Sequence, residues 1–135
     1  MGADNDKFDK YNNCIVAEIN INENEINKDI KIINSFENAK KEYHFKDMKE
    51  DYKYKNEKEI KNKCIIKINN KIIKFNYYYK FKSIGKYKIE YFFKESLEKT
   101  DYMLYECYLL ENINLSNFNT QNIKDMSICS LDVNL

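Results

Sequence analysis

The first part of the chain alternates between apolar and polar residues in a way that predicts two β-strands. Residues 14–21 (CIVAEINI) carry an apolar side chain at every second position. Successive side chains of a strand point to opposite faces, so this pattern predicts a strand with one buried face. The side chains expected to be buried are Ile15, Ala17, Ile19 and Ile21. Residues 28–36 (KDIKIINSF) indicate a second strand.

A helical period follows the second strand and predicts one helix near residues 35–48. Asn34 is its expected N-cap, with Glu37 three residues later as the reciprocal partner of a capping box. Residues 46–63 mix Lys, Asp and Glu, which favours a solvated loop or a short exposed helix over a binding patch. The apolar stripe of the predicted helix consists of Phe36, Ala39 and Tyr43.

The pattern over residues 64–93 predicts three consecutive strands joined by short turns. The first strand is CIIKIN (64–69), followed by an Asn-rich turn, because Asn tolerates positive φ. The second is KIIKFNYYYKF (71–81), and the third is KYKIEYFF (86–93), after a turn at Gly85. Such strands form an antiparallel meander. The second strand presents Ile73, Phe75, Tyr77, Tyr79 and Phe81 on one face, and the third presents Tyr87, Ile89, Tyr91 and Phe93.

The C-terminal part of the chain carries the rhythm of a structural repeat. Leu97 and Ile123 begin comparable phrases 26 residues apart, and Cys107 and Cys129 fall at similar places within them. A period of this size is typical of leucine-rich repeats, in which each coil buries its apolar side chains against the next coil. In that arrangement the strand residues Ile113 and Leu115 point into the stack, and the return side is filled by Phe118, Ile123 and Met126.

The phrase TDYMLYECYLLENINLSNFNTQNIKDMS resembles the BspA-like leucine-rich repeats of bacterial lipoproteins and protist surface proteins. It covers less than a third of the chain, roughly residues 97–127, and the array stops after about one and a half coils. The run ICSLDVNL after Ser127 is shorter than a family coil. The resemblance implies a protein-binding or adhesive surface without catalysis. The matched positions are Met103, Leu104, Cys107, Leu110, Ile113, Leu115, Ser116–Thr120, Ile123, Asp125 and Met126.

Composition sets limits on these interpretations. With 33% charged and 43% hydrophobic residues, a chain of 135 residues has enough apolar side chains for one core. All of its 23 basic residues are Lys, and Asn, Ile and Tyr are abundant, which indicates AT-rich coding and gives Lys or Asn runs little weight. The net charge of +1 supplies no general field that attracts nucleic acid or an anionic membrane.

The sequence as given predicts a cytoplasmic location. Its first 13 residues, MGADNDKFDKYNN, contain no apolar segment of a secretory signal. Gly2 is followed by Asp6 where a myristoylation signal has Ser or Thr. The longest apolar runs are far too short to cross a bilayer, so no membrane insertion is expected. A location at the cell surface is expected only if a signal has been removed.

Residues with catalytic or metal-binding chemistry are few and scattered. The four cysteines form no CxxC pair, so four small buried thiols in a reducing compartment are expected in place of a zinc site. His44 is the sole histidine and has no evident partner for acid–base work. Gly2 and Gly85 are the only glycines, which excludes a glycine-rich phosphate loop. We therefore predict a non-enzyme with no catalytic, cofactor-binding or metal-binding residues and no cofactor.

One alternative function uses the aromatic residues of the predicted meander. Tyr78 stands among several lysines, and aromatic rings amid cations on a sheet bind single-stranded nucleic acid. The chain has no RNP-like motif and no excess of positive charge, which makes nucleic acid the weaker candidate partner. The lysines in question are Lys74, Lys80, Lys82, Lys86 and Lys88.

The sequence thus predicts an α+β protein that is mainly β. Residues 1–11 form a disordered tail, residues 12–94 a small antiparallel β-rich domain with one helix, and residues 95–135 a partial leucine-rich-repeat solenoid on its edge. The expected function is non-catalytic protein–protein recognition or adhesion, with self-association through the open repeat end. The alternatives are single-stranded nucleic-acid binding and a truncated, non-functional fragment of a longer repeat protein.

Overall fold

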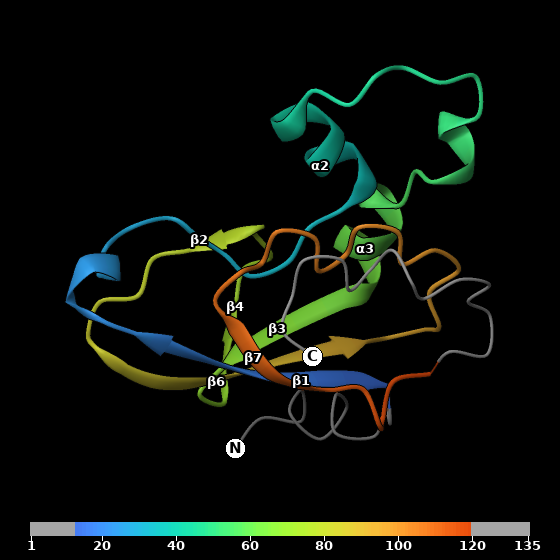
Figure 1. The fold of residues 1–135 in the computed structure, drawn as a ribbon. Coiled ribbons are helices and arrows are strands. Elements are labelled where there is room, and N and C mark those ends of the chain that lie inside the picture. The colour runs from blue at the N-terminus through green and yellow to red at the C-terminus, as the bar shows by residue number, and fades with distance from the viewer. Residues whose placement is uncertain (1–12, 120–135) are drawn as a thin grey trace.

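The computed structural model describes residues 13–119, which form a small β-rich domain around a five-stranded antiparallel sheet. The strand order is β4-β3-β6-β1-β7, and every neighbouring pair is antiparallel. In Figure 1 these strands occupy the lower half of the molecule. The strands are β1 (Cys14–Ile21), β3 (Cys64–Ile68), β4 (Lys71–Ile73), β6 (Gly85–Phe93) and β7 (Leu110–Asn114).

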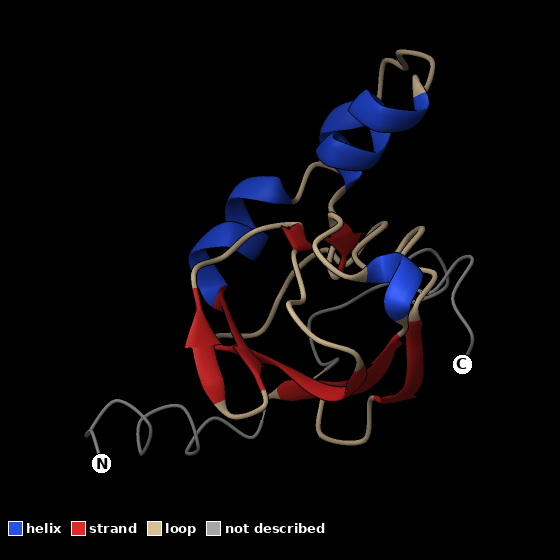
Figure 2. Cartoon of the chain, turned by 90° about the vertical axis from the view of Figure 1, so that its left-hand side faces the viewer, coloured by secondary structure: helices blue, strands red, loops and turns tan. Residues whose placement is uncertain are grey.

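Helices and a second, very small sheet lie over one face of the large sheet (Figure 2). The small sheet pairs β2 with β5 in antiparallel register. Figure 1 also shows β2 above the strands of the large sheet. The remaining elements are β2 (Ile30–Lys31), β5 (Tyr78–Tyr79), α2 (Phe36–Tyr43), α3 (Glu57–Lys63) and the 3-10 turns η1 (Glu23–Glu25) and η2 (Asp51–Lys53).

The predicted first strand is confirmed as β1, at the centre of the sheet. It pairs with β6 over its full length, from Cys14 opposite Phe92 to Ile21 opposite Gly85. The predicted inward side chains of β1 are at most 4% exposed, as expected for alternation with one buried face. The third predicted strand of the meander is confirmed as β6, whose Ile89 is fully buried.

The predicted meander order is wrong. β3 and β4 do form a tight hairpin, and its two turn residues, Asn69 and Asn70, have φ of 48° and 67° as a two-residue hairpin turn requires. However, β6 pairs with β3 and not with β4. The predicted strand over 71–81 is divided, because Asn76 accepts a hydrogen bond from the Tyr78 N–H and turns the chain out of the large sheet. Tyr78 and Tyr79 then pair with β2.

The helical segment differs from its prediction in three ways. Helix α2 ends at Tyr43, because His44 adopts the left-handed conformation with φ of 54°. Its N-cap is Ser35, whose Oγ accepts from the Asn38 N–H at 3.1 Å, and not Asn34. In the charged stretch, for which a solvated loop or a short exposed helix was predicted, residues 57–63 form a second α-helix, α3, which buries Ile60 instead of being wholly exposed.

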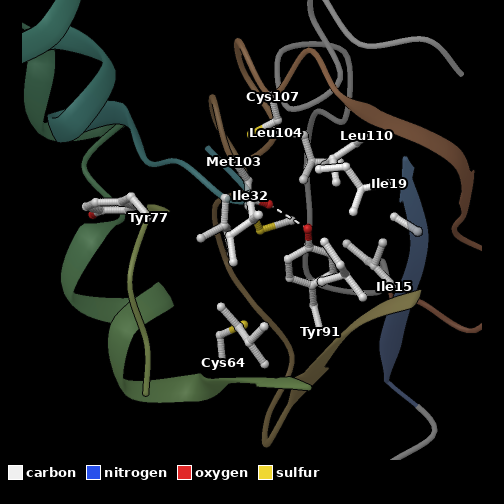
Figure 3. Packing of buried hydrophobic residues seen from close by; sticks show 14 of the residues in the cluster. Ile15, Ile19, Ile32, Cys64, Tyr77, Tyr91, Met103, Leu104, Cys107 and Leu110 are labelled. Carbon is white, nitrogen blue, oxygen red and sulfur yellow. Dashed lines mark hydrogen bonds between the residues drawn. The ribbon is translucent and has the colours of Figure 1, made fainter. Parts of the chain in front are cut away.

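The segment after β2 crosses the inner face of the large sheet and fills the core. Only Ile30 and Lys31 of the second predicted strand form a ladder, while Ile32 and Ile33 are fully buried beyond it. Figure 3 shows how Tyr91 reaches from β6 to this segment, where its hydroxyl donates a 2.5 Å hydrogen bond to the Ile32 carbonyl. This bond satisfies a backbone carbonyl that would otherwise be buried without a partner.

The segment in which a solenoid was expected contributes to the same core. β7 pairs antiparallel with β1, with Ile19 opposite Leu110, so its neighbour is the first strand and not another coil. The described residues show no solenoid. The Asn34 N–H donates to the Met103 carbonyl at 2.7 Å and joins this segment to the chain after β2. Its buried apolar residues are Leu97, Met103, Leu104, Cys107, Leu110 and Phe118.

Several predictions concern residues outside the described range. These are the tail over 1–11 and the part of the predicted repeat segment 95–135 that follows Asn119, including Ile123, Met126 and Cys129. Within residues 13–119, no helix has the length and apolar composition needed to cross a membrane.

Candidate functional site

The residues of the predicted nucleic-acid surface are divided between two places in the fold. Lys74 and Lys80 line a depression together with Tyr78. Lys86 and Lys88 lie on β6 opposite Asn20 and Glu18, on the face of the large sheet away from the core. Tyr78 lies on β5, in the other sheet. Lys86 and Lys88 each have a carboxylate oxygen within 4 Å, from Glu18 and Glu90 respectively. Lys86 and Lys88 therefore belong to a mixed-charge surface apart from Tyr78, and only part of the predicted lysine set lies beside that ring.

A depression on the opposite side of the molecule gathers residues from four separate segments of the chain. Its volume is about 400 Å³. We call it the tyrosine depression, because Tyr43, Tyr78 and Tyr108 line it. Tyr43 is 40% and Tyr108 62% exposed, whereas Tyr78 is half-buried. The other lining residues are the charged Asp29, Lys31, Glu42 and Glu106 and the apolar Ile30 and Leu109.

Secondary structure brings these residues together. The β2–β5 ladder sets Lys31 directly opposite Tyr78. The last turn of α2 supplies Glu42 and Tyr43. Glu106 has φ of 62°, which bends the segment before β7 and leads the chain to Tyr108 at the surface. The pairing of Lys31 with Tyr78 links positions 47 residues apart, so the depression depends on long-range strand pairing.

Lys31 is the central charged group of the depression. Its Nζ lies 2.8 Å from Glu42 Oε1 and 3.1 Å from Tyr43 Oη. The same nitrogen lies 4.9 Å from the centroid of the Tyr43 ring and 5.8 Å from that of Tyr78, within cation–π range of both. Burial alone would lower the pKa of Lys31, but the hydrogen bonds with Glu42 and Tyr43 outweigh it and raise the pKa. Lys31 is therefore a fixed cation.

A cluster of aromatic rings holds α2 and the chain after it against the segment before β7. Tyr43 meets Tyr105 edge-on, with centroids 5.5 Å apart. Phe45 contacts Tyr102 and Tyr105 at 5.3 and 6.0 Å, and Phe36 contacts Tyr102 at 5.8 Å. In Figure 1, α2 and the following loop stand away from the sheet, so this cluster fixes the protruding part of the molecule. It also fixes the position of the Tyr43 ring in the depression.

Helices α2 and α3 cap each other at their N-terminal ends. Oε1 of Glu37 accepts hydrogen bonds from the N–H groups of Asn56 and Glu57, at 2.9 and 3.1 Å. In return, Oδ1 of Asn56 accepts from the Phe36 N–H at 2.9 Å. The Asn56 amide also donates to the Asp101 carbonyl at 2.8 Å. Because first-turn N–H groups have no partner within their own helix, these bonds lock both helix starts together.

Burial holds one tyrosine and two cysteines near the core in their neutral forms by raising their pKa. Tyr77 Oη lies 2.8 Å from Ser35 Oγ and donates to Glu57 Oε2 at 2.7 Å. Burial, followed by the interaction with Glu57, raises the pKa of Tyr77. Burial likewise raises the pKa of the Cys64 and Cys107 thiols. The prediction of buried, free thiols is confirmed for these two cysteines, while Cys14 is half-buried.

The structure also places the histidine and the possible metal ligands that the sequence analysis considered. His44 is exposed at the C-terminal end of α2. Over residues 13–119, no three His, Cys, Asp or Glu side chains gather in a way that suits a metal ion. The sequence reasoning singled out Tyr78, but it missed Lys31 and Tyr108, because no local pattern reveals that the chain brings them together.

Comparisons with known proteins add no family to these observations. No protein-family model matches the chain, and no curated protein and no solved structure matches it. The functional argument for this chain therefore rests on the geometry of the tyrosine depression.

Proposed function

We propose that the chain is a non-catalytic protein-recognition module and that the tyrosine depression is its contact surface. The observation that carries this proposal is the convergence of three tyrosines from separate segments on one depression, with Tyr43 and Tyr108 substantially exposed. Tyrosine is enriched at the centres of protein interfaces, because its ring buries a large area with few rotatable bonds while its hydroxyl stays compatible with water.

The rigidity of the surface supports the same function. The ring contacts of Tyr43 and Phe45 and the reciprocal caps of Glu37 and Asn56 fix the elements that carry the depression. A surface that is already ordered loses less conformational entropy when a partner binds, so more of the contact energy appears as affinity.

The state of the titratable groups supports a role without catalysis. A nucleophilic lysine is neutral, whereas the pKa of Lys31 is raised and its ammonium persists at neutral pH. A reactive cysteine has a lowered pKa, whereas burial raises the pKa of both Cys64 and Cys107. These groups favour a structural or binding role over covalent chemistry.

The resemblance of residues 97–127 to BspA-like repeats favours recognition as well. Tyr108 and Leu109 line the depression and lie within that phrase. We include in the proposal that the repeat-like segment contributes to the recognition surface through Tyr108 and Leu109. The function expected from the resemblance and the function expected from the depression are the same.

The test is quantitative affinity capture from native lysate with variants of the whole chain. The Tyr43→Ser/Tyr108→Ser variant removes the two exposed rings of the depression. Tyr52→Ser is the matched control, because Tyr52 is 64% exposed but does not line the depression. We expect the wild type and the control to capture the same partner protein, and the double variant to capture at least tenfold less of it. Equal capture by all three baits would place function elsewhere, and capture of nucleic acid instead of protein would favour the alternative function.

A further inference from the structure

The lining of the tyrosine depression is acidic overall. Asp29, Glu42 and Glu106 contribute three carboxylates, and Lys31 is the single basic residue among the lining side chains, which leaves an excess of two negative charges. The whole chain has a net charge of +1, so this local excess runs against the balance of the molecule. A concave surface with such an excess attracts cations and disfavours anionic partners.

The position of Lys31 shows how this lining accommodates an ammonium group. Its Nζ forms an ion pair with Glu42 and donates a hydrogen bond to the Tyr43 hydroxyl. It also lies within cation–π range of the Tyr43 and Tyr78 rings. The faces of aromatic rings carry negative charge density, so a cation over a ring is stabilised without a formal counter-ion. The chain therefore already uses this site for a cation of its own.

Lys31 fills the inner part of the depression and leaves the outer part open. The Lys31 side chain is only 11% exposed, whereas Tyr108 is 62% exposed and the Asp29 side chain 66% exposed. Lys80 approaches Asp29 only loosely, at 3.6 Å, and its own side chain is 54% exposed. The open part thus offers the Tyr108 ring and the Asp29 carboxylate, both exposed to solvent, as lining of a depression of about 400 Å³.

We propose that the outer part of the tyrosine depression takes a lysine or arginine side chain of a partner protein, against the Tyr108 ring and the Asp29 carboxylate. This inference rests on the proposed function and specifies the chemistry of the partner. Such a side chain has a long aliphatic stem that ends in a cation. The stem matches the apolar lining residues Ile30 and Leu109, and the charged group matches the Asp29 carboxylate.

Lys31 limits the affinity of the site for such a side chain. Its ammonium repels an incoming cation, and its ion pair with Glu42 neutralises one of the carboxylates. Replacing Lys31 by the similarly long but uncharged Met therefore strengthens binding of a cationic side chain. This gain separates the proposal from a purely structural role of Lys31, because damage to the fold weakens binding.

The experiment is a titration of the isotope-labelled whole chain, followed by the backbone amide NMR shifts of Ile30, Tyr78 and Leu109. The probes are the peptide acetyl-Gly-Lys-Gly-amide and its norleucine counterpart, which has a similar stem without the charge. We expect saturable shifts with a millimolar Kd for the lysine peptide and binding about tenfold weaker for the norleucine peptide. Asp29→Asn and Tyr108→Leu each lower the affinity for the lysine peptide severalfold, and the control Tyr52→Leu leaves this affinity unchanged. Lys31→Met raises the affinity about tenfold.

The outcomes separate this inference from the proposed function. Equal shifts with both peptides overturn the preference for a cation, and so does an affinity that Asp29→Asn and Lys31→Met leave unchanged. Absence of any saturable shift at the three amides also overturns it. In each of these cases, the capture experiment with Tyr43→Ser/Tyr108→Ser decides independently whether the depression recognises proteins at all.

Discussion

Glu37, in the first turn of α2, and Asn56, the N-cap of α3, each supply a hydrogen-bond acceptor to the start of the other helix. The carboxylate of Glu37 receives the N–H groups of Asn56 and Glu57, and the side-chain oxygen of Asn56 receives the N–H of Phe36. These bonds hold together the two ends of the segment between Glu37 and Asn56. This closure gives Tyr43 and Glu42, at the end of α2, a defined position in the tyrosine depression.

Asn56→Ala tests this closure. Asn56 is 3% exposed, and its side chain bonds to the Phe36 N–H and to two backbone carbonyls, of Lys99 and Asp101. Loss of these bonds leaves buried backbone groups unpaired and lowers the free energy of unfolding by about 2–3 kcal/mol, measured by urea denaturation. Asn62→Ala, at an exposed position of α3, serves as the control and changes stability by less than about 0.5 kcal/mol. Equal effects of the two substitutions would contradict the capping role.

Tyr91→Phe tests the link between β6 and the segment that crosses the core. The substitution keeps the ring but leaves the buried Ile32 carbonyl without its 2.5 Å hydrogen bond. We expect a loss of about 1–3 kcal/mol in the free energy of unfolding. Tyr87→Phe is the matched control, because the Tyr87 hydroxyl bonds to Ser83 at an exposed site where water replaces it. A Tyr91→Phe protein as stable as the wild type would show that the bond is dispensable.

Leu110→Ala tests whether the segment before residue 119 belongs to the core of the sheet. Leu110 is 1% exposed and lies opposite Ile19. Truncating such a side chain costs about 2–5 kcal/mol, and the whole chain is expected to unfold in a single, earlier transition by circular dichroism. Leu115→Ala, at a half-buried position, is expected to cost less. Two separate transitions, with only the smaller one shifted, would mean that the segment folds independently.

The cysteines provide a test by chemical reactivity. Burial raises the pKa of Cys64 and Cys107, so thiolate is scarce at both positions and the reagent has no access. In a Cys129→Ser variant at pH 8, we expect Ellman's reagent to leave both thiols unmodified in the folded chain and to modify them in denaturant. Cys14 is half-buried, and burial followed by the charge of Glu90 raises its pKa, so it reacts slowly. Rapid reaction of two or more thiols in the folded chain would contradict the packing.

The comparison of sequence with structure shows which features local patterns determine. β1 and β6 were predictable, because an apolar residue at every second position over about eight residues identifies a strand with one buried face. The order of the next strands was not, since nothing local decides whether β3 or β4 pairs with β6. Helix α3 was missed as a core element because Ile60 is the only apolar residue in EKEIKNK, and one residue establishes no period.

The candidate site was even less accessible to sequence reasoning. Tyr43 was interpreted as part of an apolar helix stripe and Tyr108 as part of a repeat phrase, and both are exposed in the fold. Lys31 lay inside a predicted strand, in a chain where Lys is the default basic residue. The depression arises from the β2–β5 pairing and from the bend at Glu106, and both depend on contacts between distant parts of the chain.

Photo-crosslinking from the depression tests the central claim most directly. A photoreactive benzoylphenylalanine replaces Tyr108 in one whole-chain protein and Tyr52 in another, and both are irradiated in native lysate. If the depression recognises proteins, a discrete protein adduct forms from position 108 and is absent from position 52, although both tyrosines are more than 60% exposed. The same adducts from both positions, or adducts from position 52 alone, would contradict the assignment of recognition to the tyrosine depression.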